Sequence, residues 1–304
     1  MVDIIIPAYN AFDTIGNALS SILKQVNKDA LNVYIINDGS DKSYIEYISI
    51  YKDLLNVQEI IINNSGPGGA RQVGIDVSNN EYIVFLDADD ILYNEFSIVN
   101  LLNVIVDCDL AQGKYIEKRP EEDIIMSPQY CYMHGKMYRR SIIDKYKIKF
   151  DSKKREHGDM YEDSSFNQLY SMCCEKIKDT DEIVYIYNYN ERSLTRFNEN
   201  KVQNLYNFVD SMSWLADEVG KRNISNNYIV AWNFCIISMH AYFNHLITID
   251  DSDFVYTNMK KIKKIYVKYI EYLPYEDQLF IYKLFNNYQI IPQISFYDFI
   301  KKIK

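Results

Sequence analysis

The sequence has few of the residues on which common metal and phosphate motifs depend. It contains four histidines and five cysteines among 304 residues, and neither a His-Glu-x-x-His nor a Cys-x-x-Cys spacing occurs. This counts against a zinc protease and against a structural zinc site, because both place their ligands at such spacings. No Walker P-loop is present either. Scattered cysteines in odd number are typical of reduced core thiols in a cytosolic protein.

Long apolar runs and an excess of positive charge are also missing. No run reaches the roughly 20 residues of a membrane-spanning helix, and no signal peptide precedes the first expected strand. We therefore expect a cytoplasmic protein. Acidic residues outnumber basic ones by 42 to 33, for a net charge of −9. Binding to a nucleic-acid backbone needs clustered Lys and Arg, so this balance disfavours a nucleic-acid partner.

The first part of the chain alternates between strand and helix patterns. Apolar strands are expected at residues 2–7, 33–36, 58–62 and 82–86. Helices are expected from about Asp13, after Ser43, and through Val73 and Val77; on the first of these, Phe12, Ile15, Leu19, Ile22, Leu23 and Val26 form one apolar stripe. Strands rich in Ile and Val, joined by amphipathic helices, predict a parallel sheet covered on both faces.

Polar turns follow three of these strands, at residues 8–10, 38–40 and 87–89. Ligands of parallel sheets bind beyond the carboxyl ends of the strands. We therefore expect the three turns to meet at one edge and to form one pocket.

The most informative turn ends the strand at residues 82–86 with Asp87, Asp89 and Asp90. Acids at the end of a buried strand need neutralisation, and the Asp-x-Asp spacing suits a hard divalent cation with phosphate on its far side. Asp90 is expected to be a supporting or solvated acid. The alternative is a solvated acidic turn before the helix that begins near Asn94.

Four segments in order, residues 5–10, 37–40, 68–74 and 85–90, resemble the signature of glycosyltransferase family 2. The resemblance covers about residues 1–115 and returns at 134–196. It implies a GT-A fold, a Rossmann-like and mainly parallel sheet with helices on both faces. It also implies transfer of a sugar from a nucleotide diphosphate with inversion at the sugar carbon.

The resemblance assigns the donor site residue by residue. Pro7, Ala8, Tyr9 and Asn10 would lie along the base, and Asp38 would accept a hydrogen bond from a ring N–H, which favours UDP. Asp89 would bind Mg²⁺ or Mn²⁺, with Asp87 near the ribose or a metal-bound water and Ala88 beside the nucleotide. Gly68 permits close backbone approach, and Arg71 would reach base or phosphate. Simpler interpretations are a packing Tyr9, a turn-forming Asp38 and an exposed Arg71.

The catalytic base is expected downstream, in residues 158–166, where acids open an amphipathic helix. By resemblance Asp163 is the base and Glu162 orients it or the acceptor. The alternative is that these acids only favour the helix dipole, which would also depress a carboxylate pKa unless burial compensates. Further contacts on the acceptor or diphosphate side are assigned to Lys136, Arg139, His157, Arg192 and Arg196. Exposed basic residues and a loop histidine would explain these equally well.

From about Lys201 the strand pattern ends, and Val202, Leu205, Val209, Met212, Leu215 and Val219 form a helical stripe. We expect a catalytic domain at 1–200, with a nucleotide-sugar half at 1–115 and an acceptor half at 116–200, and a helical module at 201–304. A largely apolar helix at 228–247 is expected to be buried. A basic amphipathic helix at 260–268 suits the inner face of a membrane, a homo-oligomer contact or simple solvation.

Together these features predict a metal-dependent inverting enzyme that uses a UDP-sugar. The acceptor would be a hydroxyl of a glycan, a cell-wall polymer or a glycoconjugate. Two alternatives remain, a non-catalytic module that binds nucleotide-sugar or glycan, and a glycosyltransferase acting on modified nucleic acid.

Overall fold

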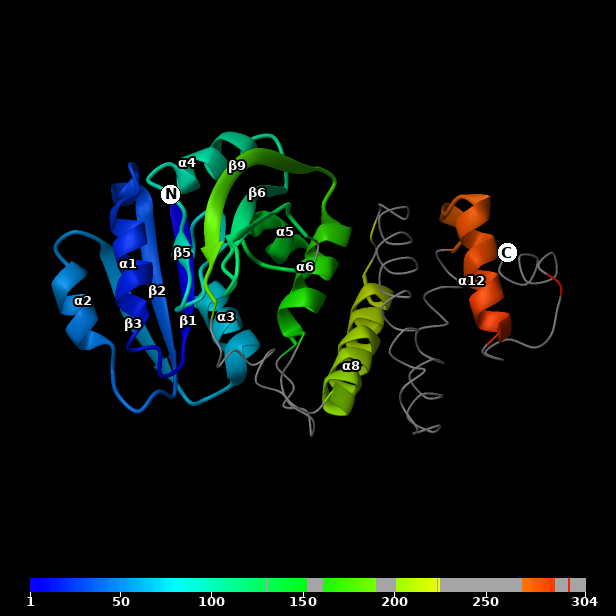
Figure 1. Ribbon diagram of the computed structural model, residues 1–304, viewed down its shortest axis with the longest axis horizontal. Coiled ribbons are helices and arrows are strands. Elements are labelled where there is room, and N and C mark those ends of the chain that lie inside the picture. The colour runs from blue at the N-terminus through cyan, green and yellow to red at the C-terminus, as the bar shows by residue number, and fades with distance from the viewer. Residues whose placement is uncertain are drawn as a thin grey trace. The chain divides into compact units, whose positions relative to one another are not determined.

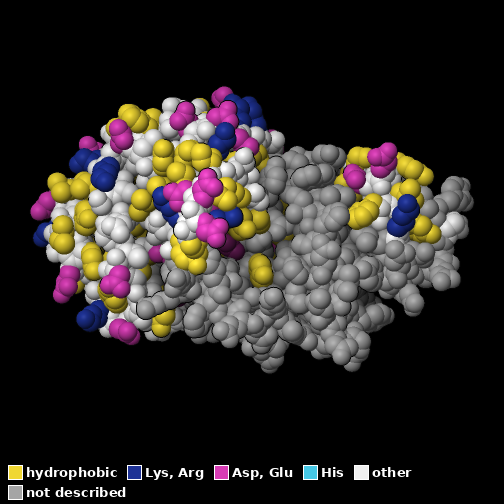
Figure 2. All heavy atoms as spheres, in the orientation of Figure 1, with side chains coloured by type: hydrophobic (Ala, Val, Ile, Leu, Met, Phe, Trp, Pro, Cys, Tyr) yellow, Lys and Arg dark blue, Asp and Glu magenta, His cyan; other side chains and the backbone are white. Residues whose placement is uncertain are grey.

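The structure is a computed structural model that describes residues 1–129, 131–151, 161–189, 201–222, 224, 270–287 and 295. The chain divides into two compact units, Met1–Phe197 and Asn198–Lys304. Figure 1 shows the first unit in blue to green and the described parts of the second in yellow to orange. On the face in view, acidic and basic side chains of the first unit are interspersed with apolar ones (Figure 2).

A mixed sheet forms the centre of the first unit. Its order is β3-β2-β1-β4-β8-β6-β9-β5, and β7 pairs with β6 outside this path. The strands are β1 (Val2–Ala8), β2 (Leu31–Asp38), β3 (Asn56–Ile62), β4 (Tyr82–Phe85), β5 (Ile91–Leu92), β6 (Leu110–Glu117), β7 (Ile124–Met126), β8 (Lys136–Arg139) and β9 (Ile177–Tyr187).

The half of the sheet that contains β1 to β4 is parallel, as the sequence predicts. Ile6 of β1 pairs with Ile35 of β2, and Ile5 pairs with Phe85 of β4. The four carboxyl ends therefore lie at the same edge. The other half departs from the expected mainly parallel sheet, because β8 is antiparallel to both β4 and β6, and β5 is antiparallel to β9. β6 and β7 are also antiparallel, since residues 118–123 are too few for the crossover that parallel strands require.

Helices cover both faces of the sheet (Figure 1). On one face α1 (Ile15–Leu23), α2 (Ile45–Tyr51) and α4 (Ser97–Ile105) share a core with β1 side chains such as Ile4 and Ile6. On the other, Gly74 of α3 (Gly66–Val77) lies directly against Ile5, and Phe166 of α6 (Glu162–Cys173) packs on Phe85. This alternation along β1 is the two-residue period of a strand buried on both faces.

Some helix boundaries differ from those expected. α1 ends at Leu23, so Val26 lies beyond it and is 56% exposed. α3 begins at Gly66, well before the Val73 and Val77 by which its helix was predicted, because proline is well accommodated in the first turn of a helix. The first unit also contains α5 (Arg140–Tyr146) and a short 3₁₀ helix, η1 (Lys28–Ala30). Among the described cysteines, Cys108, Cys173 and Cys174 are buried free thiols and Cys131 is a half-buried one.

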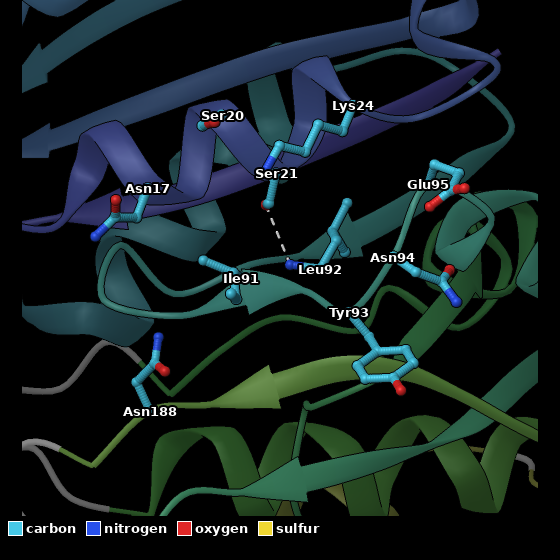
Figure 3. Close-up of a pocket in the computed structure, with 10 residues that line it drawn as sticks. All are labelled: Asn17, Ser20, Ser21, Lys24, Ile91, Leu92, Tyr93, Asn94, Glu95 and Asn188. Carbon is cyan, nitrogen blue, oxygen red and sulfur yellow. Dashed lines mark hydrogen bonds between the residues drawn. The ribbon is translucent and has the colours of Figure 1, made fainter.

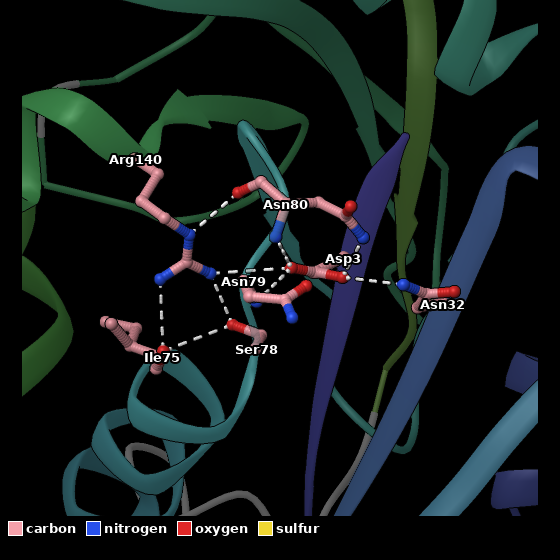
Figure 4. Close-up of polar contacts among 7 residues, drawn as sticks. All are labelled: Asp3, Asn32, Ile75, Ser78, Asn79, Asn80 and Arg140. Atoms are coloured by element: carbon pink, nitrogen blue, oxygen red, sulfur yellow. Dashed lines mark hydrogen bonds and ion pairs between the residues drawn. The ribbon is translucent and has the colours of Figure 1, made fainter.

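A buried polar network joins the two halves of the sheet (Figure 4). The Asp3 carboxylate on β1 is fully buried and accepts hydrogen bonds from the backbone N–H groups of Asn79 and Asn80, at 3.0 and 2.7 Å. Arg140, the first residue of α5, is paired with Asp3 at 3.4 Å and donates to the carbonyls of Ile75 and Asn80. The network fixes the end of α3 and the start of β4 relative to β1.

The described part of the second unit is helical, with α8 (Lys201–Gly220), the 3₁₀ helix η3 (Ile270–Tyr272) and α12 (Tyr275–Asn287). Leu215 and Val219 of the predicted stripe are buried. The expected helices at 228–247 and 260–268 lie outside the described residues. In the described part of the chain, no helix is both long enough and apolar enough to cross a membrane.

Candidate active site

Three turns beyond the carboxyl ends of β1, β2 and β4 form the candidate site. Asp38, the last residue of β2, is buried, and its Oδ1 accepts hydrogen bonds from Ser65 N at 2.7 Å and Ser65 Oγ at 3.0 Å. Gly39 has φ +76°, and a Cβ there would come within 2.9 Å of Asn64 N. Asp38 thus joins the end of β2 to the start of α3, and glycine allows the chain to turn away at once.

The first turn is tied to the second by Asn10, which has φ +50°. Its backbone N–H donates to Ser40 Oγ at 3.0 Å, and its Oδ1 accepts from Asp41 N at 2.9 Å. Ala8 is buried, whereas Tyr9 is 57% exposed. A packing role would have buried the Tyr9 ring, so its exposure beside Asp38's turn leaves the ring face available to a planar ligand.

Arg71 connects the strand end to the acids of α6. Its guanidinium donates to Asp87 Oδ1 at 2.6 Å and to Glu162 Oε1 at 2.9 Å, and only 7% of its side chain is exposed. Burial alone would lower the pKa of Arg71, but Asp87, Glu162 and Asp163 raise it by more than burial lowers it. The guanidinium therefore stays charged. The structure therefore contradicts the simpler interpretation of an exposed Arg71.

Gly68 explains how α6 approaches α3 so closely. A Cβ at Gly68 would lie 2.6 Å from Glu162 Cγ and 3.1 Å from its Cβ. Both distances are shorter than ordinary carbon contacts. The missing side chain therefore lets Glu162 reach Arg71, and Gly68 acts through protein packing.

Glu162 and Asp163 occupy the first turn of α6, directly after Tyr161 with φ +70°. Burial and the neighbouring Asp163 raise the pKa of Glu162 to about 7, against the opposing effect of Arg71. Burial also raises the pKa of Asp163, which accepts a hydrogen bond from Ser164 N at 2.7 Å. Burial thus supplies the compensation that a carboxylate at a helix N-terminus needs to act as a base.

The acids after β4 differ from one another in environment. Burial raises the pKa of Asp87, but Arg71 and His134 together lower it by more, so it lies below the usual value. Asp90, expected to be a supporting or solvated acid, is buried and therefore not solvated. Its Oδ1 and Oδ2 accept from Asn188 N and Tyr185 OH, both at 2.7 Å. Burial and the like charges of Asp87 and Asp89 raise the pKa of Asp90 well above its usual range.

His134 lies beside the acids after β4. Together, Asp87, Asp89, Asp90 and His134 are called the acidic corner. One ligand atom each of Asp87, Asp90 and His134 lie within 4.8 Å of one another, a group that Asp89 does not join. Within the described part of the chain, His134 Nδ1 is buried without a hydrogen-bond partner. Burial lowers the pKa of His134 to about 4, so the imidazole is neutral at pH 7. Carboxylates and a neutral imidazole together fit a divalent cation, which would neutralise the clustered acids.

Sequence reasoning missed His134 because it looked for metal ligands at fixed spacings along the chain. β4 and β8 are antiparallel, with Tyr82 opposite Arg139 and Ile83 opposite Tyr138. Extending that register by four residues places His134 opposite Asp87. Only the strand pairing carries this information, and the sequence did not reveal β8.

Of the basic residues assigned to the acceptor or diphosphate side, the structure describes Lys136 and Arg139. Arg139 is at the far end of β8, where it donates to the carbonyls of Ile105 and Cys108 at 2.6 and 3.0 Å and closes the end of α4. Lys136 is fully buried, and its Nζ donates to Gln129 O at 2.6 Å. Neither fits the alternative of an exposed basic residue, because both belong to β8, whose residues are buried or half-buried. His157, Arg192 and Arg196 lie outside the described residues.

A separate pocket of about 460 Å³ lies between α1 and β5. Figure 3 shows Asn17, Ser20 and Lys24 on one side of it and Tyr93 and Asn188 on the other. Asp38, Arg71 and the acids of α6 do not line it. Asn188 relates it to the acidic corner, because its Nδ2 donates to Asp89 O at 2.7 Å.

The first half of the sheet is a parallel β-α-β unit whose fourth strand ends in clustered acids, and antiparallel strands extend it. This is the architecture of a GT-A glycosyltransferase. The chain belongs to glycosyl transferase family 2, whose profile matches residues 3–154. The structure resembles TarS residues 1–349 from S. aureus, solved in complex with UDP-GlcNAc, with a TM-score of 0.68 and 18% identity over 91% of this chain and 83% of that one.

Two relatives by sequence act on poly(ribitol-phosphate), as their names state. The poly(ribitol-phosphate) beta-N-acetylglucosaminyltransferase TarP of Staphylococcus aureus is 32% identical over 170 residues, 49% of this chain and 52% of TarP. The poly(ribitol-phosphate) beta-glucosyltransferase of Bacillus spizizenii is 26% identical over 207 residues, 61% of this chain and 32% of that protein. The chain thus spans about half or less of the length of these relatives.

Proposed function

We propose that this protein is a metal-dependent inverting glycosyltransferase that moves a sugar from a UDP-sugar to an acceptor hydroxyl. The observation that carries the proposal is Arg71, which holds the acids after β4 and the acids of α6 at one site. The acids after β4 would bind the metal that a donor diphosphate needs, and the acids of α6 would supply the base that an acceptor hydroxyl needs. Inversion requires both within reach of one sugar carbon.

The donor side is proposed to be built from Pro7, Ala8, Tyr9 and Asn10, with Asp38 as the acceptor for a ring N–H. Support for UDP comes from the shared fold with TarS, which was solved with UDP-GlcNAc and with UDP. Because both named relatives glycosylate poly(ribitol phosphate), we propose a cell-wall polymer, a glycan or a glycoconjugate as acceptor.

Mn²⁺ or Mg²⁺ would be held at the acidic corner, where the sequence predicts Asp89 and Asp87 as ligands. A bound divalent cation would offset the negative charge of the leaving diphosphate. A mannosyltransferase of Pyrobaculum calidifontis with the same type of fold was solved with GDP-Man and Mn²⁺, at a TM-score of 0.55 and 13% identity.

The proposed reaction is one displacement. The acceptor oxygen forms a bond to the anomeric carbon while the bond from that carbon to the diphosphate oxygen breaks, and its electron pair leaves with UDP. Asp163 takes the hydroxyl proton. Glu162 and Arg71 orient Asp163, and burial raises the pKa of both acids, which is the direction that a base working near neutral pH needs.

UDP release tests this function directly. Nucleotide sugars are screened with and without Mn²⁺, with hydrolysis as the readout in the absence of acceptor. We expect release from a UDP-sugar only with metal, and Asp163→Asn to lower turnover by about 100-fold or more while UDP binding stays unchanged. Metal-independent release, or full activity of Asp163→Asn, would contradict the proposal. UDP binding without turnover in the wild type would favour a non-catalytic binding module.

We also propose that residues 1–200 form the catalytic domain, with nucleotide-sugar and acceptor halves at 1–115 and 116–200, and that 201–304 is an appended helical module. Donor-side residues lie before Asp90 and the proposed base after Tyr161, which is the basis for the two halves.

A further inference from the structure

The His134 imidazole is surrounded by aromatic rings. Its ring is stacked on Tyr187 and Tyr185, at centroid distances of 4.5 and 5.2 Å, and on Tyr132 at 5.7 Å. Tyr115 meets it edge-on at 5.2 Å. Four aromatic rings thus fix the orientation of an imidazole whose buried Nδ1 has no hydrogen-bond partner among the described residues.

Tyr185 connects this histidine to the two acids. Its hydroxyl donates to Asp90 Oδ2 at 2.7 Å and accepts from Asp87 N at 3.3 Å, while its ring stacks on His134. A tyrosine hydroxyl has one proton and two lone pairs, so both contacts are satisfied at once. One side chain therefore positions all three members of the group. Such supporting contacts are typical of ligands whose geometry matters.

We propose that His134 is a nitrogen ligand of the divalent cation, together with Asp87 and Asp90, and that this nitrogen makes the site favour a transition metal over Mg²⁺. This inference rests on the proposed function and defines its metal. Mg²⁺ takes oxygen ligands in near-octahedral geometry. Affinity for sites with nitrogen ligands rises from Mn²⁺ to Co²⁺, so the order Co²⁺, Mn²⁺, Mg²⁺ follows from the ligand set.

The test is pulsed electron paramagnetic resonance of Mn²⁺ bound to the full chain, with and without UDP. Wild type is expected to show the ¹⁴N coupling of a coordinated imidazole, and His134→Phe is expected to lose it. Tyr132→Phe is the matched control, since it keeps the stacked ring and should keep the coupling. By titration, His134→Phe should weaken Co²⁺ binding by about 10-fold or more, Mn²⁺ binding less, and Mg²⁺ binding least.

Tyr185→Phe provides a second variant in case His134→Phe does not fold. It keeps the ring on His134 and removes the hydroxyl between the acids, so ¹⁴N coupling should remain while Mn²⁺ affinity falls about 10- to 100-fold. Absence of ¹⁴N coupling in wild type, or its persistence in His134→Phe, overturns the inference. Metal-dependent turnover without ¹⁴N coupling would contradict this inference but not the proposed function. Coupling without UDP release under any metal would contradict the proposed function but not this inference.

Discussion

At the scale of single residues, the site is defined by acids that do not titrate alike. Asp87 is held ionised by Arg71, while the pKa values of Asp90, Glu162 and Asp163 are raised by burial. Carboxylates that have different pKa values because their surroundings differ are suited to different roles. Here the ionised Asp87 lies on the side proposed for the donor, and Glu162, with a pKa of about 7, lies on the side proposed for the acceptor.

The raised pKa of Glu162 predicts the pH dependence of activity. Glu162 and Asp163 titrate as a pair, and the step near pH 7 is that of Glu162, whose pKa is raised by burial and by Asp163. The charge that Glu162 gains there makes the neighbouring Asp163 a stronger base, so kcat/KM should rise with pH through about 7. Glu162→Gln removes this step and leaves only the titration of Asp163. In Glu162→Gln we expect the rise of kcat/KM to occur at lower pH, measured from pH 5 to 9. Glu46→Gln removes an exposed acid and should leave the pH profile unchanged. An unchanged profile in Glu162→Gln would contradict the role proposed for this acid.

Lys136 predicts a pH dependence of stability instead. Burial lowers its pKa from 10.5 to about 7, so between these values the unfolded chain binds a proton that the folded chain does not. Stability gained through this residue is therefore present at high pH and lost as pH falls through about 7. Relative to Lys136→Met, the wild-type unfolding free energy should rise by up to about 1.4 kcal/mol per pH unit across this window. Urea unfolding at pH 6, 7, 8 and 9 measures it, and parallel curves would refute the buried-lysine account.

At the scale of elements, the sequence predicted the parts whose pattern is local. β1 to β4 and α1 could be located because Ile and Val runs and an apolar stripe mark them without tertiary information. β8 was missed because Lys136 and Arg139 give a buried strand a basic sequence. Without β8 there was no register to bring His134 to Asp87, and no reason to place Arg139 at the far end of the sheet.

The contact between α3 and α6 predicts opposite effects for two glycine substitutions. Gly68→Ala would put a Cβ 2.6 Å from Glu162 Cγ, so the start of α6 must shift, and kcat should fall by about 10- to 100-fold. At Gly16 of α1 the nearest atom would be 3.7 Å away, in Tyr47. Gly16→Ala should stabilise the fold by about 0.5–1 kcal/mol with activity unchanged. Kinetics and thermal melting of both variants check this, and a fully active Gly68→Ala would show that α6 tolerates displacement.

At the scale of the whole first unit, α3 is fixed by two arginines. Arg71, in its second turn, is paired with Asp87 and Glu162, and Arg140 binds the Ile75 carbonyl near its last turn together with Asp3. Together these contacts join α3 to β1, to the turn after β4, and to α5 and α6. The sequence showed Asp3 and Arg140 only as a strand acid and a basic residue, because nothing local relates positions so far apart. The relative placement of the proposed donor and acceptor sides depends on these pairs.

Asp3→Asn therefore tests how the two halves are joined. Oδ2 of Asp3 faces the N–H donors of Asn79, Asn80 and Arg140, and Oδ1 faces the amide groups of Asn32 and Asn80. An asparagine amide must direct its own donor at one of these sets, whichever way it is turned. We expect a loss of about 2–5 kcal/mol in unfolding free energy, measured by urea denaturation with an unchanged m value. Asp13→Asn makes the same charge change at an exposed position and should cost less than about 0.5 kcal/mol. If Asp3→Asn is as mild as its control, the network does not hold the halves together.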